Sequence, residues 1–272
     1  MSRHGFLRLL SVSVAATVAL SALAADVLFP IPLHLTRQIH DSIGNSDAVV
    51  EQYCYGNRVV SVNGALTTIA DYEREELTEI DRQAGTYSIT RFDRVAKALR
   101  ATGVATATAT AAQWNVRPTG VQQMRANRMT DAFEGEMEEG TVSRHVRVAV
   151  DRSVALSKDA LDVLIGAAYP NDRKAEDHVV VEAARSRGAV APSTGSTRSF
   201  ALPVEQHFEF VIDGQRAEIR EIVTRVGDEL APADAFTVPP GAKLVESRLI
   251  TRARMIDAMT SQNLDEIRKP LQ

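Results

Sequence analysis

The sequence has a single cysteine, Cys54, among its 272 residues. One thiol cannot close an internal disulfide, so the fold has to be stabilised by core packing rather than by covalent cross-links. We predict that Cys54 is a small buried hydrophobe, which is the common role of a free cysteine, and keep a reactive thiol as the alternative.

Motifs for catalysis or nucleic-acid binding are also missing from the sequence. There is no glycine-rich phosphate loop, and Gly195-Ser196 lacks the preceding strand and following helix of a nucleophile elbow. The net charge is −4 and the lysines and arginines are scattered, unlike a nucleic-acid-binding face. We therefore expect a non-enzymatic protein with no catalytic residue, no cofactor and no nucleic-acid partner.

The histidines do not predict a metal site. His34 and His40 are six residues apart, whereas ligands on one helical face are three or four residues apart, and we expect both on the surface. His145 and His207 fall on polar faces of predicted strands and can meet across a sheet, although nothing local requires it. His178 is expected to be solvated. We expect no metal ligand.

An acidic run also invites a metal interpretation. Glu134, Glu136, Glu138 and Glu139 lack the Asp/Asn spacing and fixed turn of a calcium-binding loop. We expect them to form a solvated hairpin tip between two strands.

The first 24 residues have the pattern of a cleavable signal peptide. Arg3 and Arg8 supply positive charge, and residues 9–19 form an apolar run broken only by small hydroxyl residues. Ala22-Leu23-Ala24 places alanine at both positions that signal peptidase reads. The apolar core is too short for a typical spanning helix of about 20 residues, so a retained membrane anchor is the weaker alternative. We expect cleavage near Ala24, a periplasmic or secreted location, and no stable membrane span afterwards.

The remaining chain is expected to form one domain with two short flanking segments. Residues 25–46 are predicted to be a leader with an amphipathic turn from Leu33 to Ile43, residues 47–254 a sheet-and-helix domain, and residues 255–272 a C-terminal helix and tail. Asn63-Gly64 favours a type I′ hairpin turn, because both central residues of that turn have positive φ.

Alternating apolar and polar residues predict the strands, and apolar residues at helical spacing predict the helices. The predicted strands are 49–55, 58–62, 65–70, 77–81, 86–90, 114–118, 122–133, 141–150, 207–212, 217–226 and 243–251. The predicted helices are 93–100, 158–168 (capped by Ser157), 171–187 and 255–267, with one helical turn at 232–236. This order indicates an α+β fold, in which a curled antiparallel sheet, or half-open barrel, has helices packed on one side.

Two passages resemble a known group of proteins. The first runs from Gly56-Asn57-Arg58 to Asn63-Gly64 and continues at Ile80-Asp81-Arg82; the second is Asp213-Gly214-Gln215, followed by Phe236-Thr237-Val238-Pro239-Pro240-Gly241. They resemble exported bacterial proteins of the lipoprotein-localisation superfamily, which includes the LolA and LolB carriers and the sensor RseB. The match is to an uncharacterised branch, and Ala242 replaces the aromatic residue that usually follows the closing glycine.

The resemblance implies an apolar cavity between sheet and helices that takes acyl chains, and hence a protein of the cell envelope that binds a lipid-like or apolar ligand. A periplasmic sensor or protein-interaction module of the RseB type is the alternative, and a hydrolase is a weaker third. The residues expected to line the cavity are apolar positions of the predicted strands: Val60, Val62, Leu66, Ile69, Ile80, Tyr87, Ile89, Val146, Val148, Phe208, Phe210 and Ile212.

Overall fold

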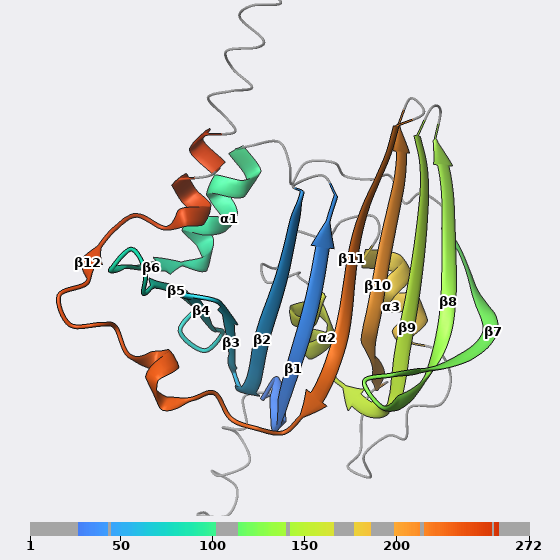
Figure 1. Cartoon of the computed structure of the whole chain (residues 1–272), viewed down its shortest axis with the longest axis horizontal. Helices are drawn as coiled ribbons and strands as arrows, with labels where there is room; N and C mark the ends of the chain where they lie inside the picture. Colours follow the sequence, from blue (N-terminus) through green and yellow to red (C-terminus); the bar gives the residue numbers. More distant parts are fainter. Residues whose placement is uncertain are drawn as a thin grey trace, which may run out of the picture.

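One large β-sheet forms most of the protein, and short helices lie against it (Figure 1). The computed structural model describes residues 27–42, 45–101, 114–139, 142–165, 177–185, 199–212, 215–251 and 253–255. The predicted signal peptide and most of the predicted C-terminal helix lie outside these ranges.

Within the described residues, the sheet has twelve strands in the order β12-β6-β5-β4-β3-β2-β1-β11-β10-β9-β8-β7, and its two edges do not close on one another. Neighbouring strands are antiparallel except β12 and β6, which are parallel. The strands are β1 (Phe29–Asp41), β2 (Ser46–Gly56), β3 (Arg58–Asn63), β4 (Leu66–Asp71), β5 (Glu76–Asp81), β6 (Thr86–Arg91), β7 (Asn115–Arg125), β8 (Arg128–Glu139), β9 (Val142–Leu156), β10 (Phe200–Ile212), β11 (Gln215–Gly227) and β12 (Lys243–Leu244). The helices are α1 (Phe92–Ala101), α2 (Lys158–Leu164), α3 (Asp177–Ala184) and the 3-10 turn η1 (Ala233–Phe236).

Strand β1 lies in the middle of the sheet, between β2 and β11. The prediction of a leader with a turn from Leu33 to Ile43 is therefore wrong. Leu33 and Leu35 are buried on one face, and His34 between them is buried on the other, which is the two-residue period of a strand covered on both sides. Pro30 and Pro32 lie where the β1–β2 pairing is irregular, before Leu33, and so do not interrupt the ladder.

The meander from β2 to β6 confirms the five strands predicted between residues 49 and 90. The turn at Gly56-Asn57 is confirmed by the pairing of Tyr55 with Arg58. The next turn is one residue later than predicted, because Asn63 pairs with Leu66 and leaves Gly64-Ala65 as the loop. Only Gly64 has positive φ there, 57°, which is the pattern of a type II′ turn rather than type I′.

A hairpin interrupts the predicted strand at 122–133. Strand β7 ends at Arg125 and β8 begins at Arg128, and the two connecting residues Ala126 and Asn127 have φ of 48° and 59°. Two positive φ values define a type I′ turn, but no glycine marks it in the sequence. The acidic run that begins at Glu134 consequently lies within β8 and not at a hairpin tip.

The strands predicted at 114–118, 141–150, 207–212 and 217–226 are confirmed, as are α1 and η1. Helices α2 and α3 lie within the predicted ranges 158–168 and 171–187 but end earlier, at Leu164 and Ala184. Residues 166–168, 171–176, 186 and 187 of these predictions lie outside the described residues. Ser157 caps α2 as predicted, since its Oγ accepts a hydrogen bond of 3.0 Å from the Ala160 backbone N–H.

The predicted last strand at 243–251 is wrong beyond residue 244. Only Lys243–Leu244 pairs with the sheet, and residues 248–251 are helical. The helical start is tied to the sheet by Glu79, whose carboxylate accepts a 3.0 Å hydrogen bond from the Arg248 backbone N–H. A carboxylate at a helix N-terminus satisfies a free backbone donor and opposes the positive end of the dipole.

All three α-helices pack against one face of the sheet, which we call the helix face. Leu35 and Cys54 join Leu161 of α2 in one core cluster, and Ala70 and Leu77 join Val95 of α1 in another. The pairing register places these strand residues on the same side of the sheet.

A third cluster lies under α3. Val146 and Val148 of β9 and Phe133 of β8 pack against Val179 of α3. Gly135 permits this approach, because a Cβ atom there would lie 2.8 Å from both Cγ atoms of Val179.

We call the opposite side of the sheet the open face, and the pairing register places His34, His40 and His207 on it. The segment 228–242 returns along the edge of the β3–β6 half, where Arg82 donates hydrogen bonds to the carbonyl oxygens of Asp234 and Thr237. No helix within the described residues is long and apolar enough to cross a membrane.

Candidate functional site

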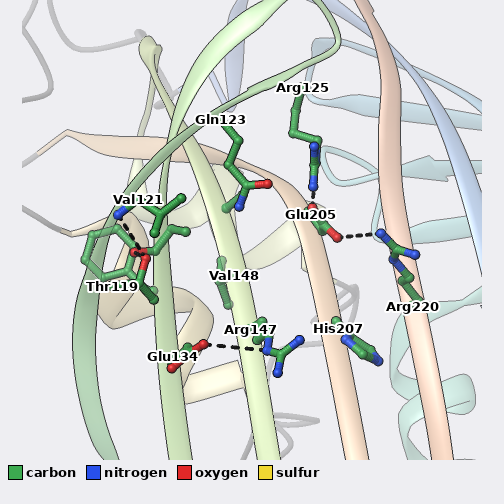
Figure 2. A pocket seen from close by; sticks show the side chains of 13 residues that line it. Thr119, Val121, Gln123, Arg125, Glu134, Arg147, Val148, Glu205, His207 and Arg220 are labelled. Carbon is green, nitrogen blue, oxygen red and sulfur yellow. Dashed lines mark hydrogen bonds and ion pairs between the residues drawn. The ribbon is translucent and has the colours of Figure 1, made fainter.

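A pocket of about 410 Å³ lies on the open face, across strands β7 to β11 (Figure 2). Charged and polar side chains on alternate residues of these strands point into it. Its lining consists of Thr119, Val121, Gln123, Arg125, Ala132, Phe133, Glu134, Arg147, Val148, Ala149, Glu205, His207 and Arg220.

Glu205 of β10 holds two arginines at this pocket. Its carboxylate accepts hydrogen bonds from Arg125 Nε at 2.6 Å and from Arg220 Nη2 at 2.9 Å, and Figure 2 shows the two guanidinium groups on either side of it. Burial raises the pKa of Glu205, but the two hydrogen-bonded guanidinium groups outweigh this and hold its pKa below the usual value. The carboxylate is therefore charged at neutral pH and fixes both arginines.

A row of side chains crosses the pocket at right angles to the strands. Glu134, Arg147, His207 and Arg220 are successive register partners on β8, β9, β10 and β11. Arg147 Nε is 3.6 Å from a Glu134 carboxylate oxygen, and the Arg147 side chain is 57% exposed. This guanidinium group is thus more loosely held than the two on Glu205, and it remains accessible to a ligand.

The pocket has a surplus of positive charge. Three arginine side chains line it and only two carboxylates, Glu134 and Glu205. Guanidinium groups present several donors in a planar fork that matches carboxylate and phosphate oxygens. The arrangement can therefore bind an anionic group together with neighbouring polar groups.

Thr119 is the one hydroxyl-bearing side chain in this lining, and its hydroxyl group is hydrogen-bonded to the backbone. Its Oγ1 donates to the Ala132 carbonyl oxygen at 3.1 Å and accepts from the Val121 N–H at 3.2 Å. Both bonds lie beside the irregular pairing of β7 with β8. Thr119 therefore fixes the edge strand through its hydroxyl group.

A second group of polar side chains continues the open face toward the other end of the strands. His207 Nε2 lies 3.2 Å from a Glu218 oxygen, and this hydrogen bond is the main cause of the lowered pKa of Glu218. His40 Nε2 is 3.8 Å from the other Glu218 oxygen, and His40 Nδ1 is 2.8 Å from Asp47. Glu209, two residues from His207, is paired with Arg216 at 2.6 Å.

His145 and His207 lie near each other on the sheet, as the prediction that they can meet requires, but they are not directly opposite. They lie on neighbouring strands and the same face, but Glu209 is the register partner of His145, and Arg147 is the partner of His207. The side chain that reaches His207 is instead Glu218 of β11.

The surface location predicted for His34 is wrong, whereas His40 is half-exposed as expected. His34 is 4% exposed. Its Nε2 lies 2.6 Å from Glu51, its Nδ1 lies 3.0 Å from Glu229, and its ring stacks on Tyr53 with centroids 4.2 Å apart. Helical spacing suggested that His34 and His40 could not share a face, but in a strand residues six apart do share one.

Cys54 is a buried hydrophobe, as predicted. It is 1% exposed and belongs to the core cluster under α2. Burial raises the pKa of its thiol to about 12, so almost none is thiolate at neutral pH, and the thiolate is the reactive form.

The twelve residues predicted to line one cavity are divided between the two faces of the sheet by the pairing register. Of them, Val148 alone belongs to the lining of the charged pocket, although its side chain packs against α3 on the helix face. Ile89 is 53% exposed. On the open face of β3–β6 lie Val60, Val62, Ile69, Ile80, Tyr87 and Ile89. On the helix face lie Leu66, Val146, Val148, Phe208 and Phe210, while the side chain of Ile212 is outside the described residues.

Sequence reasoning missed the charged residues of the pocket. Arg125, Glu205 and Arg220 come from three different strands, and 80 residues separate the first two in the chain. The signal available in the sequence was a polar or charged side chain at every second position, as at Glu205 and His207. That signal gives the face of a strand but not which strands are neighbours.

The fold and pocket define a class of architecture and no more: a sheet-dominated protein with an open antiparallel sheet, helices on one face and a charged pocket on the other. No family model and no curated protein matches the sequence. Among solved structures, the chain is similar to "Structure of PNGF-II in C2 space group", with a TM-score of 0.32 and 10% identity. The match covers 83% of this chain and 32% of that chain, so this chain spans about a third of its length.

Proposed function

We propose that this chain is a non-enzymatic, exported binding protein whose ligand occupies the charged pocket on the open face. The observation that carries the proposal is the pocket of about 410 Å³ with three arginines held by two glutamates. Binding pockets of about 300–1,000 Å³ with a few fixed polar groups are typical of small-molecule sites.

The chemistry of the pocket favours a small anionic ligand over an apolar one. Arg147 is the accessible cation, and Arg125 and Arg220 are already oriented by Glu205. Because Glu205 fixes these two side chains before binding, less conformational entropy is lost when a carboxylate or phosphate group arrives.

The absence of enzymatic activity is supported by the pocket's lining. The hydroxyl of Thr119 is bonded to backbone groups, and the carboxylates of Glu134 and Glu205 are engaged with arginines. A hydrolase needs a nucleophile hydrogen-bonded to a base, and this set of residues does not offer one. Export is supported by the signal-peptide pattern of residues 1–24.

The test is a thermal-shift and calorimetry screen of the purified protein against small carboxylates, sugar acids and phosphate esters. A ligand should bind the wild type, and Arg147→Gln should weaken its binding by about tenfold or more, since hydrogen bonds to charged groups are worth about 1.5–3 kcal/mol. Arg91→Gln is the matched control, because Arg91 is 57% exposed like Arg147 but lies on β6, outside the pocket. Equal loss in both variants, or no ligand in the screen, would refute the proposal.

A second candidate is the lipid-like ligand implied by the family resemblance. A groove of about 400 Å³ lies between α1 and the residues Glu246, Ile250, Ala253 and Arg254, and its lining also includes Arg94, Lys97 and Ala98 of α1. The apolar Ala98, Ile250 and Ala253 suit an acyl chain, and Arg94 and Lys97 suit an acidic head group, whereas Arg254 is already paired with Glu246 at 2.7 Å. Burial of the chain contributes about 0.8 kcal/mol per CH₂.

This candidate is tested by displacement of a fluorescent fatty acid. Ala98→Trp fills the groove and should abolish binding of the fluorescent fatty acid. Arg147→Gln in the charged pocket should leave that binding unchanged. Absence of fatty-acid binding by the wild type would exclude the lipid-like ligand and leave the charged pocket as the proposed site. This candidate is also supported by the open antiparallel sheet with helices on one face, because the lipoprotein-localisation superfamily has a half-open barrel of that kind.

A further inference from the structure

The open face carries a second constellation, which shares only His207 with the lining of the charged pocket. His207, Glu209 and Glu218 come from two adjacent strands, β10 and β11, and each offers one ligand atom within 4.8 Å of the other two. All three side chains are partly buried, with exposed fractions of 15%, 21% and 35%. They therefore stand on paired strands of the sheet and still face solvent.

We propose that His207, Glu209 and Glu218, with His40 as the fourth ligand, bind a divalent transition-metal ion of the zinc type. The geometry of strands explains why these side chains converge. His207 and Glu209 are at i and i+2 and so project from the same face, and Glu218 is the register partner of Glu209 on the next strand.

The distances fit a small ion. Ligand atoms around tetrahedral zinc lie about 2.0–2.2 Å from the metal and hence about 3.3–3.6 Å from each other. His207 Nε2 and the Glu218 oxygen are 3.2 Å apart, close to this spacing. The ligand atoms of the three residues lie within 4.8 Å of one another. For all three to bind one ion, the carboxylate of Glu209 must move about 1 Å closer to the other two ligand atoms.

That movement costs little. Glu209 would exchange its ion pair with Arg216, whose side chain is 62% exposed. An exposed ion pair contributes little to stability, so a bond from the carboxylate to the metal can replace it. Arg216 would remain in solvent.

His40 is suited to be the fourth ligand because one of its ring nitrogens is held by a carboxylate. His40 lies outside the group whose ligand atoms are within 4.8 Å of one another, so its side chain must turn toward the ion. Its Nδ1 lies 2.8 Å from the Asp47 carboxylate, and its Nε2 is 3.8 Å from a Glu218 oxygen. A carboxylate that accepts from one ring nitrogen fixes the tautomer in which the other nitrogen is a bare lone pair, the arrangement that surrounds metal-binding histidines. Asp47 thus positions His40 without touching the ion.

The donor set also selects the class of ion. Two imidazole nitrogens and two carboxylates favour zinc, cobalt, nickel or copper, whereas calcium and magnesium prefer sites built from oxygen alone. The site is therefore distinguishable from a merely acidic surface, which would bind calcium as readily as zinc.

The test uses the whole purified protein, without a histidine tag and freed of metal with a chelator. Isothermal titration with ZnCl₂ alone should show one site per chain, and the presence of millimolar CaCl₂ or MgCl₂ should not reduce its affinity. Titration with CoCl₂ should produce visible d–d absorption bands of a four- or five-coordinate ion. No zinc binding, or binding that calcium abolishes, overturns the proposal.

Four variants assign the ligands: His207→Gln, Glu209→Gln, Glu218→Gln and His40→Gln. Each should lower zinc affinity at least tenfold, since loss even of an outer-shell partner typically costs 10- to 100-fold. His178→Gln is the matched control, because His178 is exposed on α3 over the helix face.

The outcomes separate the claims. Unchanged affinity in the variants of His207, Glu209 or Glu218 overturns the site, and an unchanged His40→Gln overturns the fourth ligand. Because the cobalt bands report on the wild type alone, their absence overturns the site even if a variant does not fold. Arg147→Gln should keep zinc binding, so failure of the metal site and failure of the anion pocket are distinguishable.

Discussion

At the scale of single residues, the open face depends on charges that are fixed by their neighbours. Glu205 is the clearest case, because its side chain is 13% exposed and carries two hydrogen-bonded arginines. A buried carboxylate without partners would be protonated or destabilising. The partners therefore turn a costly charge into one that organises the pocket.

Glu205→Gln should destabilise the protein by about 1–3 kcal/mol at pH 7, because it keeps the shape but removes the charge that holds Arg125 and Arg220. The folded-state pKa of Glu205 lies below its ordinary value of 4.5, so its charge stabilises the fold above that value, and this contribution is lost as the pH falls through the folded pKa. Urea unfolding at pH 7 and at pH 3 measures the difference, which should be large at pH 7 and shrink at pH 3. Glu136→Gln, at a 56% exposed position, should change stability by no more than about 0.5 kcal/mol. A Glu205→Gln effect that is the same at both pH values would contradict the prediction.

Gly135→Ala should destabilise the protein by about 1–3 kcal/mol through overpacking. Its new Cβ would lie 2.8 Å from Val179, which is fully buried under α3 and has no free space to move. Denaturant unfolding of the variant checks the value. In a Val179→Ala background the same substitution should cost much less, because the clashing methyl groups are gone, and equal costs in both backgrounds would show that the clash is not the cause.

At the scale of elements, strands were predictable where they alternate and turns where glycine marks them. The meander β2–β6 has both signals, and its strands and the Gly56-Asn57 turn were found. The turn at Ala126-Asn127 has no glycine, so the hairpin of β7 and β8 was missed. Strand β1 was missed because it is covered on both faces and begins beside Pro30 and Pro32, which together hide the alternation.

The candidate site was less predictable than the elements that carry it. Its residues come from β7, β8, β9, β10 and β11, and a strand's sequence gives the face of each side chain but not its neighbours in other strands. Glu205 and Arg125 meet because the β7–β8 hairpin brings Arg125 to β10. The sequence contains no local trace of that contact.

The unmarked turn leads to a prediction at this scale. Ala126→Gly should stabilise the protein by up to about 1 kcal/mol, because a left-handed backbone costs alanine about 1–2 kcal/mol and glycine little, while glycine loses more entropy on folding. Thermal and urea unfolding measure the gain. The control is Ala155→Gly within β9, where φ is that of a strand and glycine should destabilise by about 0.5–1 kcal/mol. A loss of stability at both positions would contradict the turn assignment.

At the scale of the whole molecule, β1 joins two half-sheets. Strands β2 to β6 come from residues 46–91 and strands β7 to β11 from residues 115–227, and only β1 pairs with both. The core cluster under α2 also spans this junction, since it contains Leu35 of β1, Cys54 of β2 and Val223 of β11. Opening the sheet at β1 should therefore expose the core of both halves.

Cys54 reports on that opening, because it is the single thiol, is 1% exposed and has its pKa raised to about 12. Reaction with Ellman's reagent at pH 8 should be very slow in the native protein and rapid in denaturant, since the folded thiol is neither accessible nor ionised. Leu35→Ala should destabilise by about 2–5 kcal/mol and so speed native-state labelling about 30-fold or more, as each 1.4 kcal/mol is a factor of ten. Ile31→Ala, on the same strand but 74% exposed, should label at the wild-type rate. If Leu35→Ala also labels at that rate, Cys54 becomes accessible by a local motion that leaves β1 in place, and the sheet does not open as one unit at its central strand.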